Sequence, residues 1–168
     1  RSRGLGDVYK RQGLMNGTSA STFSPDAAMT RAMMVTILWR MEKEPAALKS
    51  NFTDLTADWY RTAVDWAAET GVVNGVGNGK FAPNATLSLE QLITILYRYA
   101  ENKGYNVSKS ASLDSFTDGS AVSAYARPAM QWAVGMNFLS GNTLTPGAPA
   151  SRAQIAQVLM LFCKAYIK

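Results

Sequence analysis

The sequence contains no histidine and only one cysteine in 168 residues. Histidine is the most common general base and transition-metal ligand in proteins, so its absence removes the residue on which many catalytic and metal sites depend. The single Cys163 permits no intrachain disulfide and no cysteine-based metal site, and its apolar neighbours predict a small buried side chain. The chemistry that remains open is that of carboxylates, hydroxyls and cations.

Long hydrophobic runs are also missing. No stretch approaches the roughly 18 apolar residues of a membrane-spanning helix, and the first residues do not resemble a signal peptide. With 47% hydrophobic and 17% charged residues, the composition predicts one soluble globular domain of ordinary size. We therefore expect no membrane insertion.

Excess positive charge is confined to the N-terminus. Residues 1–12 carry four of the 17 basic residues and one of the 12 acidic ones, which leaves 13 basic and 11 acidic residues, a net charge of +2, in the rest of the chain. The formal net charge of +5 is therefore not a nucleic-acid signal. The segment shares none of the repeat pattern of the remaining residues and looks like translated adapter sequence, so we expect it to be foreign to the fold or disordered.

Three copies of one helix-start pattern organise the remaining sequence. Each copy has a proline, which suits a turn, and five positions later a hydroxyl residue that can cap a helix. Apolar residues recur 4, 7, 8 and 11 positions after the hydroxyl and therefore share one helical face. Gln91 and Gln154 are spaced to complete capping boxes. The pairs are Pro25 and Thr30, Pro83 and Ser88, and Pro146 and Ser151.

A further amphipathic helix precedes the pattern in two of the copies. Phe52-Thr53-Asp54 and Phe116-Thr117-Asp118 open these segments, and we expect each Asp either to cap a turn ahead of the helix or to line a polar groove. The aromatic residues behind them have helical spacing, so we expect them to pack in the core. They are Trp59 and Trp66 in one copy and Tyr125 and Trp132 in the other.

The repeat predicts an all-α protein built from helix-loop-helix units. Residues 13–45 form the second half of a first repeat, residues 51–104 a complete second repeat, and residues 115–168 a complete third repeat. Between the two helices of the second repeat, Gly71 and Asn74-Gly75 suit a left-handed helix end followed by a loop.

Arg31 and Arg152 stand at the first helical position of two copies, where the helix macrodipole disfavours a cation. The ordinary explanation of such a residue is an arginine at the solvated surface without a specific function. Recurrence at an unfavourable position favours an anion site instead. In that site, the free N–H groups of the helix N-terminus, the capping hydroxyl and the guanidinium would converge.

Taken in order and repeated, these motifs resemble the S-layer homology domain, and the resemblance covers residues 13–168. Such modules form an all-helical, pseudo-threefold bundle of three repeats. The motifs that carry the resemblance are Phe52-Thr53-Asp54, Trp59, Trp66-Ala67, Gly71, Asn74-Gly75, Phe81-Ala82-Pro83, Thr30-Arg31-Ala32 and Ser151-Arg152-Ala153-Gln154.

The resemblance implies an extracellular module that is covalently part of a larger exported bacterial protein. It implies non-covalent anchoring to the cell wall through secondary cell-wall polysaccharide, an anionic polymer with pyruvate ketals. The residues themselves lead us to expect no nucleic acid, cofactor, metal ion or catalytic residue. The implied polysaccharide-binding residues are Arg31 and Arg152 for the carboxylate, Thr30 and Ser151 as supporting hydroxyls, and Asp54 and Asp118 for sugar hydroxyls.

The sequence also departs from the family pattern. Leu89 stands where the signature has arginine, and Glu90 beside it would repel a carboxylate. If the arginine of one repeat pairs with the aspartate of the next, only Arg31 with Asp54 is complete, so we expect at most one strong site. The alternative is a structural or protein-interaction repeat with decayed sugar sites. A glycosidase needs two opposed carboxylates, and no such pair recurs, so we expect no enzyme.

Overall fold

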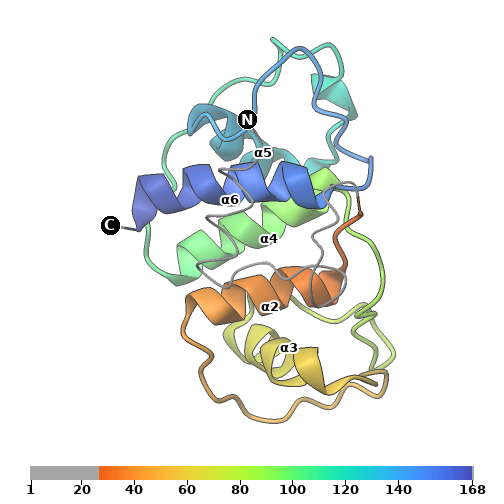
Figure 1. The fold of residues 1–168 in the computed structure, drawn as a ribbon. Coiled ribbons are helices and arrows are strands. Elements are labelled where there is room, and N and C mark those ends of the chain that lie inside the picture. Colours follow the sequence, from red (N-terminus) through yellow and green to blue (C-terminus); the bar gives the residue numbers. More distant parts are fainter. Residues whose placement is uncertain (1–26, 168) are drawn as a thin grey trace. The chain divides into compact units, whose positions relative to one another are not determined.

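The computed structural model describes residues 27–167, which form α-helices and two short 3-10 helices with isolated bridges but no strand. The all-helical prediction is confirmed, whereas the pseudo-threefold arrangement of repeats stays a prediction. None of the helices in this range has the length and apolar character that a bilayer crossing requires. The elements are α2 (Arg31–Met41), α3 (Asp58–Thr70), α4 (Leu89–Asn102), η1 (Gly119–Ala121), η2 (Ala124–Ala126), α5 (Arg127–Gly135) and α6 (Arg152–Tyr166) (Figure 1).

The predictions for residues 1–12, for the start of the first repeat and for Pro25 lie outside the described residues. The described chain divides into two compact units, and the boundary between them falls after Thr86. That boundary lies inside the second sequence repeat, between its two helices. Each unit therefore combines the second helix of one repeat with the first helix of the next.

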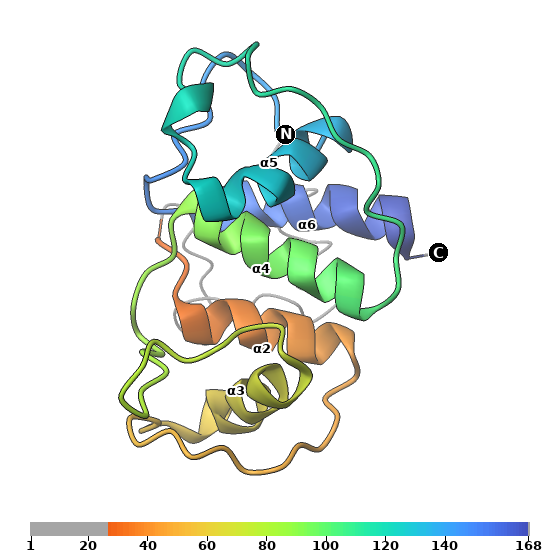
Figure 2. The same ribbon diagram turned by 180° about the vertical axis from the view of Figure 1, so that it is seen from behind.

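In the first unit, α2 packs along α3 (Figures 1 and 2). Leu38 of α2 and Tyr60 and Val64 of α3 are fully or almost fully buried. The N-terminus of α2 and the C-terminus of α3 match the sequence prediction. The Thr30 hydroxyl accepts a hydrogen bond from the Met33 amide at 3.1 Å, and Gly71 ends α3 with a φ of 78°.

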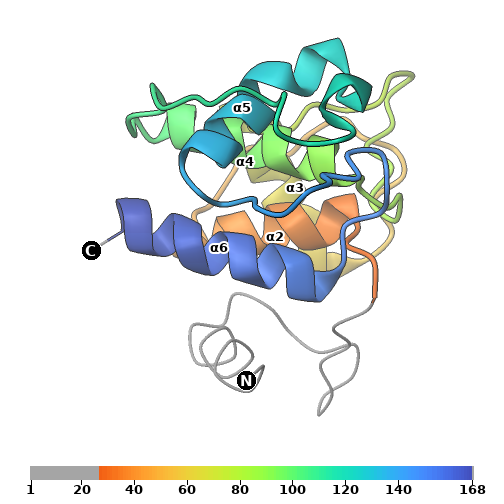
Figure 3. The same ribbon diagram turned by 90° about the horizontal axis from the view of Figure 1, so that it is seen from above.

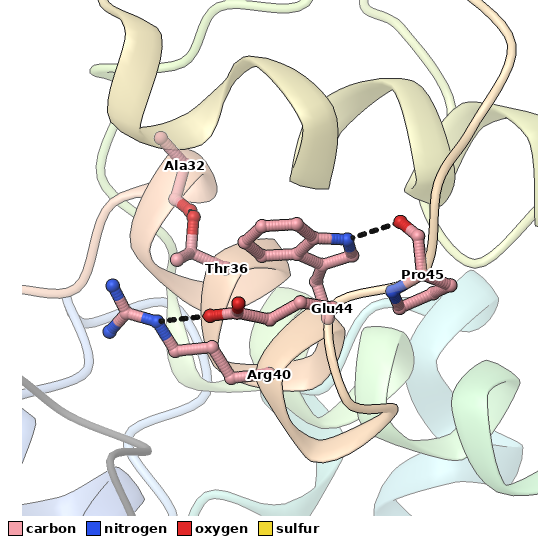
Figure 4. A network of polar contacts seen from close by, with 6 residues as sticks. Ala32, Thr36, Arg40, Glu44 and Pro45 are labelled. Carbon is pink, nitrogen blue, oxygen red and sulfur yellow. Dashed lines mark hydrogen bonds and ion pairs between the residues drawn. The ribbon is translucent and has the colours of Figure 1, made fainter.

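A short polar network fixes the C-terminal end of α2 (Figure 4). The Trp39 indole donates to the Pro45 carbonyl at 2.8 Å, and Arg40 lies 3.9 Å from Glu44 in an i,i+4 ion pair. Farther up the helix, the buried Thr36 hydroxyl donates to the Ala32 carbonyl. The chain therefore leaves α2 in a defined direction.

In the second unit, α4 lies beside α5, and aromatic contacts connect both helices to α6 (Figure 3). The ring centroids of Tyr99 and Phe162 are 6.0 Å apart, and those of Trp132 and Phe162 are 6.4 Å apart. Ser88 and Gln91 form the predicted capping box. At the start of α6 the Ser151 hydroxyl accepts a hydrogen bond from the Gln154 amide. Among the described residues, no bond from the Ser151 amide to the Gln154 side chain completes the predicted capping box.

The core prediction is confirmed for Trp66 and Trp132 and wrong for the other two aromatic residues. Trp59 is 51% exposed and Tyr125 is 55% exposed. The inward position belongs to the next residue, which is Tyr60 in α3 and Ala126 before α5. A shift of one residue turns a helical side chain by about 100°, which is enough to move it from the core to the surface.

Candidate functional site

The N-terminus of α2 docks on the proline turn that belongs to the second repeat. The amide of Arg31 donates to the Ala85 carbonyl and the amide of Ala32 to the Pro83 carbonyl, both at 2.9 Å. Thr30 and Thr86 form an antiparallel bridge at the same place. The first turn of the helix is therefore paired with backbone more than fifty residues away in sequence.

The same docking recurs at α4 in the second unit. The amides of Leu89 and Glu90 donate to the carbonyls of Ala148 and Pro146, each at 3.0 Å, and Ser88 bridges to Pro149. The register is identical in the two units, so the proline turn of one repeat is the acceptor for the helix start of the repeat before it.

This docking corrects the prediction of free N–H groups at the start of α2. The Met33 amide is also used, because it donates to the Thr30 hydroxyl, and the regular helix bonds begin with the Met34 amide, which donates to the Thr30 carbonyl. The amides of Arg31, Ala32 and Met33, which have no acceptor in the backbone of their own helix, therefore all have acceptors elsewhere in the protein. An anion at this position would have to bind the arginine side chain and not the helix end.

The Arg31 side chain connects two loops of the second repeat. Its Nε donates to the Phe81 carbonyl at 2.9 Å and its Nη2 donates to the Asn74 carbonyl at 2.7 Å. The guanidinium carbon lies 4.7 Å above the centre of the Phe81 ring. Burial lowers the pKa of Arg31 and the charge of Asp54 raises it, but an arginine stays charged in either case.

Asp54 holds the same turn from its other side. Its carboxylate accepts from the amides of Phe81 and Ala82, at 2.9 and 2.8 Å. Ala82 has a left-handed φ of 58°, which a residue with a Cβ rarely adopts, so the carboxylate stabilises a strained conformation. Burial raises the pKa of Asp54, but the hydrogen bonds from these two amides outweigh it, and the pKa is lowered overall.

Asp118 does the same in the second unit. It accepts from the amides of Leu144 and Thr145, both at 2.8 Å, and Thr145 has a left-handed φ of 46°. Hydrogen bonds from Leu144 and Thr145 lower the pKa of Asp118. Neither aspartate caps a local turn, as the sequence allowed, because the amides that each one binds lie 26 to 28 residues away in the chain.

The second unit lacks the arginine of the family signature. Leu89 is buried where Arg31 stands in the first unit. The carbonyl of Leu144 corresponds to that of Phe81, and it accepts from the Thr145 hydroxyl at 2.7 Å instead of from a guanidinium. Glu90 is also buried, and its carboxylate accepts from the amide and hydroxyl of Ser123 at 2.9 and 2.6 Å. Glu90 therefore secures the segment before α5.

The structure brings two of the predicted site residues together, since Arg31 and Asp54 both bind Phe81. Thr30 caps the helix that carries Arg31. Arg152, at the start of α6, is only 5% exposed, and its burial lowers its pKa. Ser151 caps that helix, whereas Asp118 binds the turn at residues 144–145.

Two arginines that the sequence analysis did not single out also hold the aspartate segments. Arg61 donates to the Leu55 carbonyl, and Arg127 donates to the Gly119 carbonyl at 3.3 Å. Each acceptor directly follows the aspartate of its repeat. The available signal was that each arginine stands two positions after an aromatic residue, Trp59 or Tyr125. Within residues 27–167 no group of three acidic or cysteine side chains could hold a metal ion.

A sequence model of the S-layer homology domain matches residues 6–33, 51–93 and 115–156, which is more than half of the chain. An endoglucanase from Bacillus sp. (strain KSM-635) is 32% identical over 160 residues, a match that covers 91% of this chain and 16% of the endoglucanase. A surface-layer 125 kDa protein from Lysinibacillus sphaericus is 30% identical over 153 residues, covering 87% of this chain and 13% of that protein.

A cell surface protein from Thermoanaerobacter kivui is 33% identical over 92 residues, covering 51% of this chain and 12% of that protein. The chain thus spans less than a fifth of the length of each of these relatives. Relatives named as enzymes and relatives named as surface proteins share this region, so the similarity follows the repeats and not the remainder of each protein.

Proposed function

Because the chain belongs to the S-layer homology domain family, we propose that it anchors a larger exported protein by non-covalent binding of pyruvylated secondary cell-wall polysaccharide. Domains of this family are cell-wall anchoring modules, and the matches to a surface-layer protein and a cell surface protein give a wall-associated location at the cell surface. The chain itself acts as an attachment module without catalysis, and any enzymatic activity belongs to another part of the parent protein.

The observation that carries the proposal is the state of Arg31. Its guanidinium is oriented by two backbone carbonyls, and among residues 27–167 no carboxylate lies within ion-pair distance of it. Those two bonds use Nε and one hydrogen of Nη2, so Nη1 and the other Nη2 hydrogen remain as donors. A ketal pyruvate is a carboxylate, which is a suitable acceptor for a pre-oriented guanidinium.

The other proposed residues divide into contact and positioning roles. Thr30 retains a hydroxyl hydrogen that can be donated to the polymer, because its oxygen acts as the acceptor in the helix cap. Asp54 positions Phe81, whose carbonyl is the partner of Arg31, and the remaining lone pairs of its carboxylate accept from sugar hydroxyls. Arg152, Ser151 and Asp118 are the corresponding residues of the third repeat and stay in the proposal on the family resemblance alone.

One observation favours the alternative of a structural or protein-interaction repeat. The N–H groups at the start of α2 and the carboxylates of Asp54 and Asp118 are all engaged within the protein. A repeat in which every such group serves the fold needs no external ligand.

Sedimentation with purified wall sacculi separates the two functions. We expect the full chain to sediment with sacculi that retain the secondary polymer and to stay in solution once the polymer is stripped. Binding should also weaken with polymer that lacks pyruvate. Removal of the pyruvate and the change Arg31→Ala should each abolish most of the affinity without adding, since they delete the two partners of one contact. Equal sedimentation before and after stripping would contradict polysaccharide binding and favour the structural or protein-interaction repeat.

A further inference from the structure

The loop that follows α3 contains a tight turn formed by an Asn-Gly pair. The Lys80 amide donates to the Gly77 carbonyl at 3.0 Å, and the two central residues, Asn78 and Gly79, have φ values of 55° and 72°. Positive φ at both central positions defines a type I′ turn, which Asn-Gly pairs favour. The turn is continued by a bond from the Val76 amide to the Lys80 carbonyl.

Gly79 is an exposed residue of this turn. Within the described residues it donates no hydrogen bond, and a Cβ built on Gly79 would meet nothing within 4 Å. Asn78 is exposed as well. An exposed asparagine followed by glycine is the chemical arrangement in which the next amide nitrogen most readily reaches the side-chain carbonyl carbon, because glycine has no Cβ to obstruct the approach.

A second Asn-Gly pair, Asn74-Gly75, lies in the same loop and is also exposed, but neighbouring groups hold its backbone. The Asn74 carbonyl accepts from Arg31 Nη2 at 2.7 Å. A Cβ built on Gly75 would lie 2.6 Å from the Phe52 ring and 2.8 Å from the Lys80 carbonyl oxygen, so the backbone there is closely packed. Closure of a five-membered ring requires the backbone to rotate, and this packing opposes the rotation.

We propose that Asn78 is a site of spontaneous deamidation in this protein and that Arg31 and Phe52 protect Asn74 from the same reaction. The Gly79 nitrogen loses its proton to solvent and attacks the side-chain carbonyl carbon of Asn78. The new C–N bond closes a succinimide and the amide nitrogen leaves as ammonia. Water then opens the ring at either carbonyl, which yields aspartate or isoaspartate. The net reaction converts an amide and one water into a carboxylic acid and ammonia, with no change of oxidation state.

The product would alter the surroundings of Arg31. Isoaspartate adds one methylene to the main chain at residue 78, which the type I′ turn cannot accommodate. The Gly79 carbonyl accepts from the Thr53 amide at 2.9 Å, so displacement of the turn pulls on the residue next to Asp54. Either product also places a carboxylate in the loop whose Asn74 carbonyl orients Arg31. If the proposed function holds, deamidation at Asn78 weakens binding to the anionic polymer.

The modification is tested by mass spectrometry without any wall ligand. The full chain is incubated at neutral pH and digested with trypsin, which cuts after Arg61 and Lys80, so both pairs lie in one peptide and fragment spectra assign the site. We expect Asn78 to deamidate several-fold faster than Asn74, with isoaspartate detected by enzymatic methylation. Arg31→Ala should accelerate the reaction at Asn74 and leave the rate at Asn78 unchanged.

The variant Asn78→Gly is the matched control, because glycine keeps the positive φ and removes the reactive amide. It should abolish the mass increase at residue 78. Deamidation at Asn74 that equals or exceeds that at Asn78 in the unchanged protein would overturn the proposal. An intact Asn78, under conditions that fully deamidate a synthetic peptide of residues 62–80, would overturn it as well. Loss of polymer binding in aged protein but not in aged Asn78→Gly tests the consequence separately from the chemistry.

Discussion

Arg31 and Asp54 hold opposite sides of the same backbone residue. Arg31 Nε donates to the Phe81 carbonyl at 2.9 Å, and the Phe81 amide donates to Asp54 Oδ1 at the same distance. A cation on the carbonyl and an anion on the amide fix the orientation of the turn at residues 81–83. The carbonyls of Pro83 and Ala85, at the end of this turn and just after it, accept the first amides of α2, so the two side chains stabilise the docking between consecutive repeats.

Asp54 should make the stability of the first unit dependent on acid. Its folded-state pKa is depressed, so the stabilisation is fully present above the ordinary carboxyl pKa of 3.8 and is lost as the pH falls through the lower folded value. Asp54→Asn should flatten the acid side of a plot of unfolding free energy against pH. At neutral pH, Asp54→Ala removes the hydrogen bonds to the Phe81 and Ala82 amides. We expect it to lower the unfolding free energy by only about 1 kcal/mol, because water can partly replace these bonds at a partly exposed site.

Asp58→Asn is the control for this experiment, since Asp58 is an exposed carboxylate in the first turn of α3. Chemical denaturation between pH 2 and pH 7 would measure both variants. If the unfolding free energy of Asp54→Asn changed with pH in the acid range as it does in the unchanged protein, the ionised carboxylate would not be the group that stabilises the turn.

Replacing Arg31 should separate its charge from its geometry. We expect Arg31→Ala to lower the affinity for pyruvylated polymer by about tenfold or more, which corresponds to about 1.4 kcal/mol. Arg31→Lys keeps the charge but loses the fork that reaches both Asn74 and Phe81, so it should recover only part of the affinity.

Arg40→Ala is the matched control, because Arg40 lies on the same helix and pairs with Glu44 at the surface. Titration calorimetry with the polymer and thermal unfolding should be measured together for all three variants. If Arg40→Ala weakened binding as much as Arg31→Ala, the effect would be one of net charge, and the assigned position would be wrong.

The second unit offers a test by restoration. Leu89→Arg alone should destabilise the protein, since it buries a charge while the Thr145 hydroxyl occupies the Leu144 carbonyl. Adding Thr145→Ala frees that carbonyl and reproduces the alanine that the first unit has at residue 82. We expect the double variant to be more stable than the sum of the single changes predicts.

Denaturant titration of the two single variants and the double variant gives this coupling. Additive free energies would contradict the equivalence of the two docking sites. Polymer titration of the double variant gives an independent reading, because a restored guanidinium should add binding sites to those of the unchanged protein.

Fluorescence tests the exposure of Trp59. Trp59 is 51% exposed, whereas Trp39 is only partly exposed and Trp66 and Trp132 are buried. Trp59→Phe should therefore remove most of the emission that acrylamide quenches readily. The same substitution at Trp66 should leave that quenchable fraction in place while it lowers stability through loss of core packing. An unchanged quenching curve for Trp59→Phe would show that Trp59 is buried and not exposed.

Much of the local structure was predictable because its determinants lie within a few residues of one another. Thr30, Ser88 and Ser151 cap their helices through an amide three positions later, and this spacing is legible in the sequence. The left-handed end at Gly71 follows from glycine itself. The inward position was missed by one residue at Trp59, because Trp59 and Tyr60 are both aromatic and periodicity alone does not select between them.

By itself, the sequence determined the helix starts, their caps, the repeat and the family, since each rests on short-range hydrogen bonds or on a pattern of apolar residues. Only the tertiary structure decided which groups those helix starts and aspartates bind. The Arg31 side chain meets an acceptor 50 residues away, and Asp54 meets its donors 27 and 28 residues away. Packing between consecutive repeats selects such partners, because a buried amide or carbonyl takes whichever complementary group the fold brings within reach.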